Sequence, residues 1–451
     1  MVRRRALPLW FCFLSVNGRL NVNSDFASVQ EQASKIRSDI IGWRRALHSE
    51  PELMYQEHKT SKYIQGVLDN LGISFTAGWA NNTRQDRIPG VGGTGVVADI
   101  GSGTPVVALR ADIDALPIEE QIPSTALPYR SKHAGRMHAC GHDGHTSMLL
   151  GAAKLLKEVA DELPGTVRLI FQPAEEGGAG AKRMREEGVL KGVSRVFGLH
   201  VWPALPSGSI GGRAGVTMAA GDFFELDIVG KGGHGAMPHL GVDPVVAAAA
   251  IVQSIQSLVS RETDPRDSAV LSITMLHAGD AYNVIPAKAT LGGTMRALSE
   301  ASLGLLRSRM LEVVESVATA HRCSVARLKF QPDPFPATVN DPGLWRWLGS
   351  PAVGIEKNGV PMHWDMEPTM GSEDFSFFAQ DVPAAFVFLG QGSGKLEDGE
   401  GTRPEKYPTN TTVHSPRYVL DEGVLDLGTA LHAHFALRSL SSLRGSGSTE
   451  L

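Results

Sequence analysis

The sequence predicts an α/β protein of two domains, in which a smaller α+β domain interrupts the chain of a larger one. Short apolar segments with strand character alternate with helical segments over the first two hundred residues, as they do in an α/β sheet covered on both faces. The pattern changes near residue 220, where partly alternating strands begin, and α/β character resumes after about residue 331. We therefore expect a central mixed sheet flanked by helices in the larger domain.

The larger domain is expected to comprise residues 27–220 and 332–440. It should begin with a helix over residues 28–48, which Pro51 follows as a stop signal. A second helix is expected at 147–159. The segment 80–93 is polar and rich in glycine, and indicates a loop. The predicted strands of this domain are 95–100, 106–109, 167–171, 195–199 and 384–389.

The inserted domain is expected to span residues 221–331. Asp243 and Pro244 offer an N-cap and a first-turn proline for a long apolar helix over 245–259. A second helix is expected at 303–321. The predicted strands of this domain are 222–228, 269–275 and 289–296, which gives a β-α-β-β-α order.

Both ends of the chain differ in composition from these domains. Residues 1–26 are expected to be a leader, because arginines at 3–5 precede the apolar run 6–16, as in a secretory signal. Residues 441–451 are expected to form a disordered tail. The final Ser-Thr-Glu-Leu departs from the Lys/His-Asp-Glu-Leu retrieval signal. The expected location is the secretory pathway, with residence in the endoplasmic reticulum left open, and the cytoplasm if the leader is not functional.

Composition and charge limit the partners of the protein. The 451 residues are 42% hydrophobic and 20% charged, which is typical of a globular chain. A net charge of -5, without a long basic run after residue 5, favours neither nucleic acid nor an acidic membrane surface. No segment after the leader is long enough to span a bilayer. The three cysteines, Cys12, Cys140 and Cys323, do not form a disulfide framework.

The densest chemical signal is the segment 137–145, which reads MHACGHDGH. Three histidines and one cysteine, separated by small residues on what should be a short loop, offer several soft or borderline metal donors. An isolated histidine near a cysteine is usually unremarkable, but this density favours a metal site.

Two further segments place metal-binding side chains directly after apolar strands. The strand at 167–171 leads to the adjacent carboxylates Glu175 and Glu176, and residues 196–199 lead to His200. Functional groups of an open α/β sheet gather at the carboxyl ends of its strands. One of two neighbouring acids can bind metal while the other acts as general base for a water. Each segment alone would more often be a solvated edge or a core histidine, but three such segments together indicate a metal centre.

Two other functional motifs, one for dinucleotide binding and one for a serine hydrolase, are not supported by the sequence. The segment 90–95, GVGGTG, matches the dinucleotide pattern G-x-G-x-x-G, but it follows a polar loop and precedes a strand. The dinucleotide motif has to follow a strand and begin a helix, so we interpret this segment as a loop. No serine lies in a G-x-S-x-G context, which leaves a serine-hydrolase nucleophile unsupported.

A series of short motifs runs along the chain: RRALHSEPEL (44–53), ALRADIDALPIEE (108–120), MHACGHDGHT (137–146), FQPAEEGGAGA (171–181), GLHVWP (198–203), GKGGHGAMPH (230–239), NVIPA (283–287), GGTMRAL (292–298) and MGSEDFSFF (370–378). Over residues 30–437 the chain resembles the amidohydrolase branch of the di-metal aminoacylase/carboxypeptidase family, of the M20 type. Within this branch, VRLIFQPAEEGGAGAKRMREEGVL and HSPRYVLDE most resemble plant hydrolases of auxin–amino acid (IAA–amino acid) conjugates.

The resemblance implies a layout for two divalent ions. Cys140 would bridge them as a thiolate. Glu176 and His414 would complete the shell of one ion, and His142 and His200 that of the other. The resemblance favours Mn(II), although thiolate and imidazole also suit Zn(II).

The resemblance also assigns the acid next to the ligands. Glu175 would act as general base and later protonate the leaving amine. In relatives outside this branch, a histidine two residues before an aspartate is a ligand. Here that position is Asp112, so the ligand is lost and His142 is expected to replace it. Asp114 is then expected to orient an imidazole.

The inserted domain resembles a lid that also mediates dimerisation. His234 would stabilise the oxyanion of the reaction, either in its own chain or across a homodimer. Asn283 and Arg296 would recognise the substrate, and the guanidinium of Arg296 suits the free carboxylate of an amino acid. The alternatives are a loop histidine at 234 and a surface ion pair at 296.

The function implied is hydrolysis of the amide bond of a small N-acyl amino acid, with an indole-3-acetyl (auxin) conjugate as the first hypothesis. The second hypothesis is a general N-acyl amino acid or hippurate-type amidohydrolase without an auxin role. The third is a non-catalytic metal-binding or regulatory protein, which is disfavoured because five candidate ligands and a base are all present.

Overall fold

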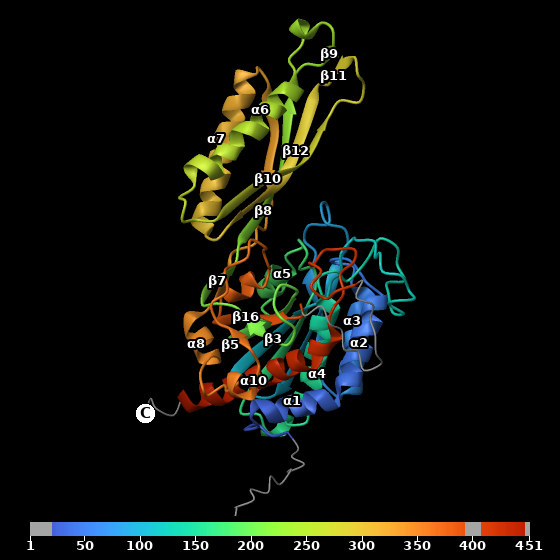
Figure 1. The fold of residues 1–451 in the computed structure, drawn as a ribbon, viewed down its shortest axis with the longest axis vertical. Coiled ribbons are helices and arrows are strands. Elements are labelled where there is room, and N and C mark those ends of the chain that lie inside the picture. The colour runs from blue at the N-terminus through green and yellow to red at the C-terminus, as the bar shows by residue number, and fades with distance from the viewer. Residues whose placement is uncertain (1–19, 393–406, 447–451) are drawn as a thin grey trace, which may run out of the picture.

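The computed structural model describes residues 20–392 and 407–446. Figure 1 shows two domains, with the smaller one formed by a single stretch, residues 220–330, and the larger one by the chain on either side. The predicted α/β class with an inserted α+β domain is confirmed. The basic and apolar residues 3–16 of the expected leader and the final Ser-Thr-Glu-Leu lie outside the described residues.

The larger domain is built on an eight-stranded mixed sheet with the order β1-β2-β4-β3-β5-β16-β6-β15. Its four middle strands are mutually parallel, and β3 and β16 are buried along their whole length. This explains their continuous apolar sequences, because a strand covered on both faces has no solvent side. The strands are β1 (Phe75–Asn81), β2 (Gly92–Gly101), β3 (Val106–Asp112), β4 (Thr166–Gln172), β5 (Val193–Trp202), β6 (Ile210–Gly211), β15 (Met362–His363) and β16 (Ala384–Gly390).

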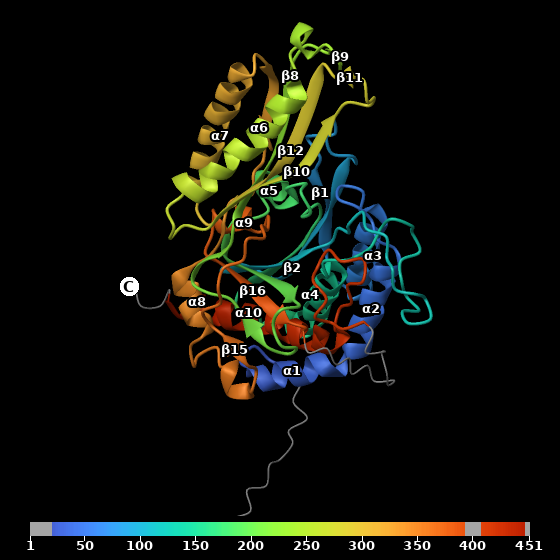
Figure 2. The ribbon, with the colours of Figure 1, turned by 45° about the horizontal axis from the view of Figure 1, so that its top comes forward.

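Helices cover both faces of this sheet, each over its own apolar core. One face carries α1 (Phe26–Lys35), α2 (Arg37–Ser49), α3 (His58–Asn70), α4 (His142–Lys157) and α10 (Leu425–Ser446). The other carries α5 (Gly180–Glu186) and α9 (Ser376–Ala379), which lie on the side of the inserted domain in Figure 2. The short helix α8 (Pro342–Leu348) packs beside β16, and β7 (Gly215–Met218) pairs with β14 (Thr338–Asn340).

The inserted domain is an antiparallel sheet with the order β10-β12-β8-β13, covered on one face by α6 and α7. Asp243 caps α6 through its carboxylate, as the sequence predicted. A two-stranded ribbon of β9 and β11 lies at the end of this domain away from the larger one (Figures 1 and 2). The elements are β8 (Ala220–Val229), β9 (Gly233–His234), α6 (Pro244–Ser257), β10 (Ala269–Ala278), β11 (Val284–Ile285), β12 (Lys288–Ala297), α7 (Glu300–Ala320) and β13 (Ser324–Phe330).

Several predicted boundaries are wrong. The helix predicted at 28–48 is divided at Ile36, whose backbone leaves the helical region. The helix predicted to begin at residue 147 begins at His142, because polar residues fill its first turn. At the end of the expected leader 1–26, Leu20 is buried and Asp25 caps α1. The expected tail is wrong for residues 441–446, which continue α10.

The short strands β6, β7, β9, β11, β14 and β15 were not predicted, and neither were two longer strands, β1 and β13. Both are edge strands of their sheets and are only partly buried, so neither has a continuous apolar sequence. The segment 90–95 begins no helix, but β2 starts at Gly92, so its interpretation as a loop is wrong for residues 92–95. Among the described residues, no helix has the length and apolar character needed to cross a membrane.

Candidate metal centre

The fold brings the ends of three strands and the start of one helix to the same place. Strands β4, β3 and β5 are parallel neighbours, so their carboxyl ends share one edge of the sheet. Glu175 and Glu176 follow β4, Asp114 follows β3, and His200 lies near the end of β5. Helix α4 leads from β3 back to β4, and its first turn therefore lies at this edge as well.

The start of α4 depends on Gly141, which stands at the N-cap with φ of 93°. A Cβ atom there would lie 2.8 Å from the Tyr418 hydroxyl and would also collide with Val201. Only glycine fits this left-handed, crowded position. It places Cys140 on one side and His142 on the other, so residues 142–145 are helical rather than part of the short loop that we expected.

Two groups of possible metal donors share Cys140. The first group is Cys140, His142 and His200, and the second is Cys140, Glu176 and His414. In each group the donor atoms lie within 4.8 Å of one another. The Cys140 Sγ atom is 3.4 Å from His200 Nε2, and His414 Nε2 is 3.1 Å from Glu176 Oε1. The structure thus brings together all five residues that the sequence singled out as ligands.

Backbone carbonyls orient two of the imidazoles. His142 Nδ1 lies 2.8 Å from the Asp114 carbonyl oxygen, and His200 Nδ1 lies 2.7 Å from the Val201 carbonyl oxygen. A carbonyl accepts only an N–H, so each ring donates through Nδ1 and directs Nε2 toward the cluster. His142 Nε2 is buried and has no hydrogen-bond partner among the described residues. An imidazole held in this way fits a metal ligand.

His414 completes the second group from a distant part of the chain. Its backbone N–H donates to the Ala139 carbonyl, 2.8 Å away, and its φ is 64°. Hydrogen bonds to Cys140 and Glu176 raise the pKa of His414 to about 10. The thiol and the carboxylate stabilise this proton. The same two groups would stabilise a divalent cation in its place.

A third donor group, Asp112 with His142 and His145, fits a metal less well. His145 has no free nitrogen, because Nδ1 lies 2.6 Å from Asp112 Oδ1 and Nε2 accepts the Val201 N–H at 3.0 Å. We therefore interpret His145 and Asp112 as a support behind the cluster. The sequence analysis assigned no role to His145, although the residue stands in the MHACGHDGH segment.

Glu175 lies beside the two donor groups in a buried, acidic environment. Burial, together with Glu373, Glu176 and Asp374, raises the pKa of Glu175 well above its usual value. The backbone N–H of Asp374 lies 3.4 Å from Glu175 Oε1. Arg110 holds Glu373 and Asp374 at 2.8 and 3.1 Å. The motif MGSEDFSFF contains both acids, but the sequence alone gave them no role.

Asp114 does more than the sequence predicted. Its backbone carbonyl orients His142, and its carboxylate oxygens accept the N–H groups of Glu175 and Glu176, each at 3.0 Å. The expected contact with an imidazole is present as well, with Asp114 Oδ1 3.4 Å from His142 Nδ1. Asp114 therefore connects the start of α4 with the loop that carries the two glutamates.

The three residues predicted in the inserted domain lie in different places. Arg296 on β12 reaches the Ser372 hydroxyl in the larger domain, and its guanidinium lies 5.2 Å from the ring centroid of Phe223. His234 and Asn283 are exposed on the ribbon of β9 and β11, at the far end of the domain (Figure 1). The structure does not bring these two residues to the metal donors of their own chain.

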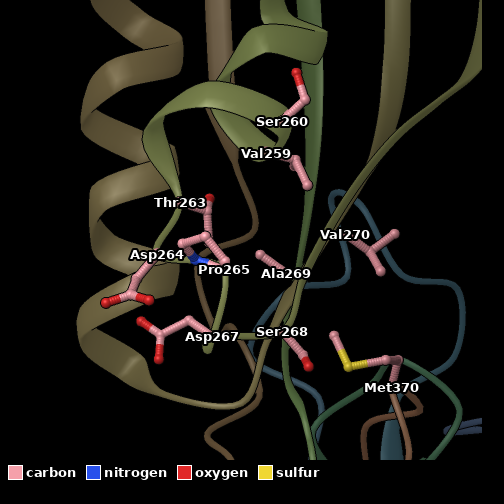
Figure 3. A pocket seen from close by; sticks show the side chains of 10 residues that line it. All are labelled: Val259, Ser260, Thr263, Asp264, Pro265, Asp267, Ser268, Ala269, Val270 and Met370. Atoms are coloured by element: carbon pink, nitrogen blue, oxygen red, sulfur yellow. The ribbon is translucent and has the colours of Figure 1, made fainter.

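A cavity of about 360 Å³ lies at the base of the inserted domain, where the loop after α6 faces Met370 (Figure 3). Its acidic residues are engaged elsewhere, since Asp264 pairs with Arg266 and Asp267 accepts the Ser302 hydroxyl. None of the predicted ligands lines this cavity.

Comparisons with known proteins agree on one family. Residues 108–435 match the model of peptidase family M20/M25/M40. The chain is 42% identical over 439 residues to IAA-amino acid hydrolase ILR1-like 4 of Arabidopsis thaliana, covering 96% of this chain and 92% of the relative. It is 39% identical to the N-acetyl-L-cysteine deacetylase of Bacillus subtilis, over 81% of this chain and 85% of that protein. The solved YXEP protein of Bacillus subtilis, described as a dinuclear metal binding peptidase, superposes with a TM-score of 0.69 and 36% identity, over 90% and 99% of the two chains.

Replacing the shared thiol tests the metal centre. We expect Cys140→Ala to bind fewer than about one Mn(II) per chain after dialysis, against about two for the unchanged protein, because both donor groups lose a ligand. Elemental analysis of the dialysed protein measures this ratio. Cys323→Ala, in the inserted domain, is the matched control and should keep the full amount. Equal metal content in the two variants would show that Cys140 is not a shared ligand.

Proposed function

The chain belongs to peptidase family M20/M25/M40, and we propose that it is a metal-dependent amidohydrolase that splits N-acyl amino acids into a free acid and an amino acid. One observation carries this proposal. Two donor groups share a buried thiol, and a buried carboxyl group, Glu175, lies beside them. Such a site can activate water next to a polarised carbonyl.

The proposed cofactor is a pair of divalent ions. Cys140 would bridge them, with Glu176 and His414 on one ion and His142 and His200 on the other. When bound, the ions lower the pKa of a water molecule and polarise the scissile carbonyl group. The family resemblance supports Mn(II), and the thiolate and imidazole donors keep Zn(II) as the second candidate.

Glu175 is the proposed general base and acid. Its carboxylate takes a proton from the attacking water as the new C–O bond forms at the amide carbon. The carboxylic acid then gives this proton to the nitrogen of the leaving amine as the C–N bond breaks. The acidic surroundings of Glu175 favour its protonated form, which suits the second step.

Arg296 is the proposed binding group for the free carboxylate of the substrate. Its side chain is largely buried at the junction of the two domains, and burial lowers its pKa. Arg296 forms no ion pair with any of the described residues. The alternative interpretation, in which Arg296 belongs to a surface ion pair, is therefore not supported. A buried guanidinium without a carboxylate partner is suited to a carboxylate ligand. Gly221 leaves the space that the Arg296 side chain occupies.

A homodimer is proposed to complete the site. His234 and Asn283 are exposed at the far end of the inserted domain, so we propose that they serve the donor groups of a second copy. The edge strand β10 presents Met275 and Leu276, which are 47% and 49% exposed. Exposed apolar side chains on an unpaired edge strand favour association.

The relatives support two substrate classes. The plant relatives are named as hydrolases of IAA-amino acids, and the bacterial relative as a deacetylase of N-acetyl-L-cysteine. We propose indole-3-acetyl amino acids as the preferred substrates, with general N-acyl amino acids as the second candidate. The secretory location remains a proposal from the sequence of residues 1–16 alone.

A substrate panel tests the proposed reaction. With Mn(II) present, we expect release of free amino acid, with kcat/KM for indole-3-acetyl-alanine about tenfold or more above that for benzoyl-glycine or N-acetyl-cysteine. Chromatographic measurement of the released amino acid gives the rates. A preference for benzoyl or acetyl substrates would favour the second candidate. No release from any of them would favour a non-catalytic metal-binding protein.

Glu175→Gln separates catalysis from metal binding. The amide has nearly the same shape but cannot accept a proton from water, so we expect kcat to fall by about 10²- to 10⁴-fold. The amount of bound Mn(II) should not change, because the ligands are intact. Steady-state rates and elemental analysis are measured on the same preparation. A variant with unchanged turnover would remove Glu175 from the mechanism.

Mixing two inactive variants tests the dimer. In a heterodimer of Glu175→Gln and His234→Ala chains, one site has an intact Glu175 and receives an intact His234 from the other chain. We expect an equal mixture, refolded or co-expressed, to regain about a quarter of the normal rate. If His234 served its own chain, no heterodimer site would be complete and the mixture would stay inactive.

A further inference from the structure

We infer that Glu57 is a positioning residue for the loop that carries Glu175 and Glu176, and that it acts as a hydrogen-bond acceptor from that loop. The inference rests on the proposed function of these two glutamates and adds a residue that touches neither of them. The carboxyl group of Glu57 has unusual surroundings.

Glu57 is fully buried, and none of the described cationic side chains forms an ion pair with it. Burial and the nearby carboxylate of Asp114 raise the pKa of Glu57 to about 8. A buried carboxyl group without a cation destabilises a fold unless hydrogen bonds compensate it. Glu57 stands at the N-cap of α3, yet its side chain makes no hydrogen bond to that helix. Its hydrogen bonds are therefore directed to other parts of the molecule.

Those bonds lead to the loop after β4. Glu57 Oε1 accepts the backbone N–H of Ala174 at 2.9 Å and that of Tyr55 at 2.9 Å. Its other oxygen, Oε2, accepts the Thr94 hydroxyl at 2.7 Å. Ala174 directly precedes Glu175 and has φ of 58°, a left-handed conformation that is unfavourable for alanine. The hydrogen bond to Glu57 helps to hold this backbone.

Tyr55 extends the same support along the loop. It too has a positive φ, 60°, and its hydroxyl donates to the Gly178 carbonyl at 2.6 Å. Asp114 accepts the next two N–H groups after Ala174, those of Glu175 and Glu176. Two carboxyl groups, those of Glu57 and Asp114, thus accept three successive N–H groups, so Glu175 and Glu176 cannot shift independently.

This geometry predicts what each replacement does. Alanine at position 57 removes the acceptor, so Ala174 can relax and move Glu175 and Glu176 away from their places. We expect Glu57→Ala to lower kcat and the affinity for Mn(II), each by about 10- to 100-fold, with KM nearly unchanged. Glutamine keeps one oxygen for both N–H groups and can donate its amide to Thr94. We expect Glu57→Gln to restore kcat to within about threefold of the unchanged protein.

Glu52→Ala is the matched control. Glu52 lies five residues earlier and accepts the N–H and hydroxyl of Thr60 at 2.8 and 3.1 Å, but it makes no such bond to the loop. Its loss should lower the melting temperature much as Glu57→Ala does, while kcat and metal affinity stay unchanged. Kinetics, calorimetric titration with Mn(II) and thermal melting are measured for all three variants.

Two results would overturn the inference. One is a Glu57→Ala variant that, like Glu52→Ala, loses only thermal stability. The other is a Glu57→Gln variant as inactive as Glu57→Ala, which would make the charge of Glu57 decisive instead of its acceptor geometry. The Mn(II) titration needs no substrate, so it tests the positioning of Glu176 even if the unchanged protein hydrolyses none of the amides. The experiments therefore distinguish failure of the positioning role of Glu57 from failure of the proposed function.

Discussion

The crowding of acidic groups inside the protein is the constraint on which the rest of the structure depends. Cys140, Glu176 and Glu175 lie close together with little contact with water, next to Asp112 and Asp114. Charges of like sign in such surroundings repel one another strongly. In the structure, protonated imidazoles can relieve part of this repulsion: the pKa of His142 lies well above its usual value because Asp112 and Cys140 lie nearby, although burial opposes the shift. Divalent cations bound by these donors would relieve it more fully, since each carries two positive charges.

The fold supplies rigid positions for these charges. Parallel strands bring residues from three separate parts of the chain to one edge, and the start of α4 adds Cys140 and His142. Side chains on the ends of buried strands move little, because the strands are packed on both faces. The segment with His414 is less enclosed, and its side chain is 51% exposed. Among the five candidate ligands, His414 is the most exposed.

The sequence predicted the fold class and the residues of the candidate metal centre. It was less successful for the residues that hold these side chains in place. Cys140, His142 and His200 could be found because ligand types followed apolar strands or stood close together. The start of α4 was missed because its first turn is polar and shows no apolar period. Glu57 and His145 both accept hydrogen bonds from backbone N–H groups. Because a backbone N–H does not depend on residue type, the sequence does not reveal such a hydrogen bond. Their roles could be read only from the folded arrangement.

The inserted domain shows a different limit of prediction from the sequence. Arg296 could be placed from the sequence and does lie at the junction with the larger domain, close to the loop that contains Asp374. His234 belongs to the same domain but stands on a ribbon at the opposite end. If Arg296 and His234 act on one substrate, as proposed, they cannot both reach the same metal centre from opposite ends of one domain. The proposed second copy of the chain would resolve this conflict by supplying its own ribbon to the centre. The length of the inserted domain thus supports the proposed dimer as much as its exposed edge does.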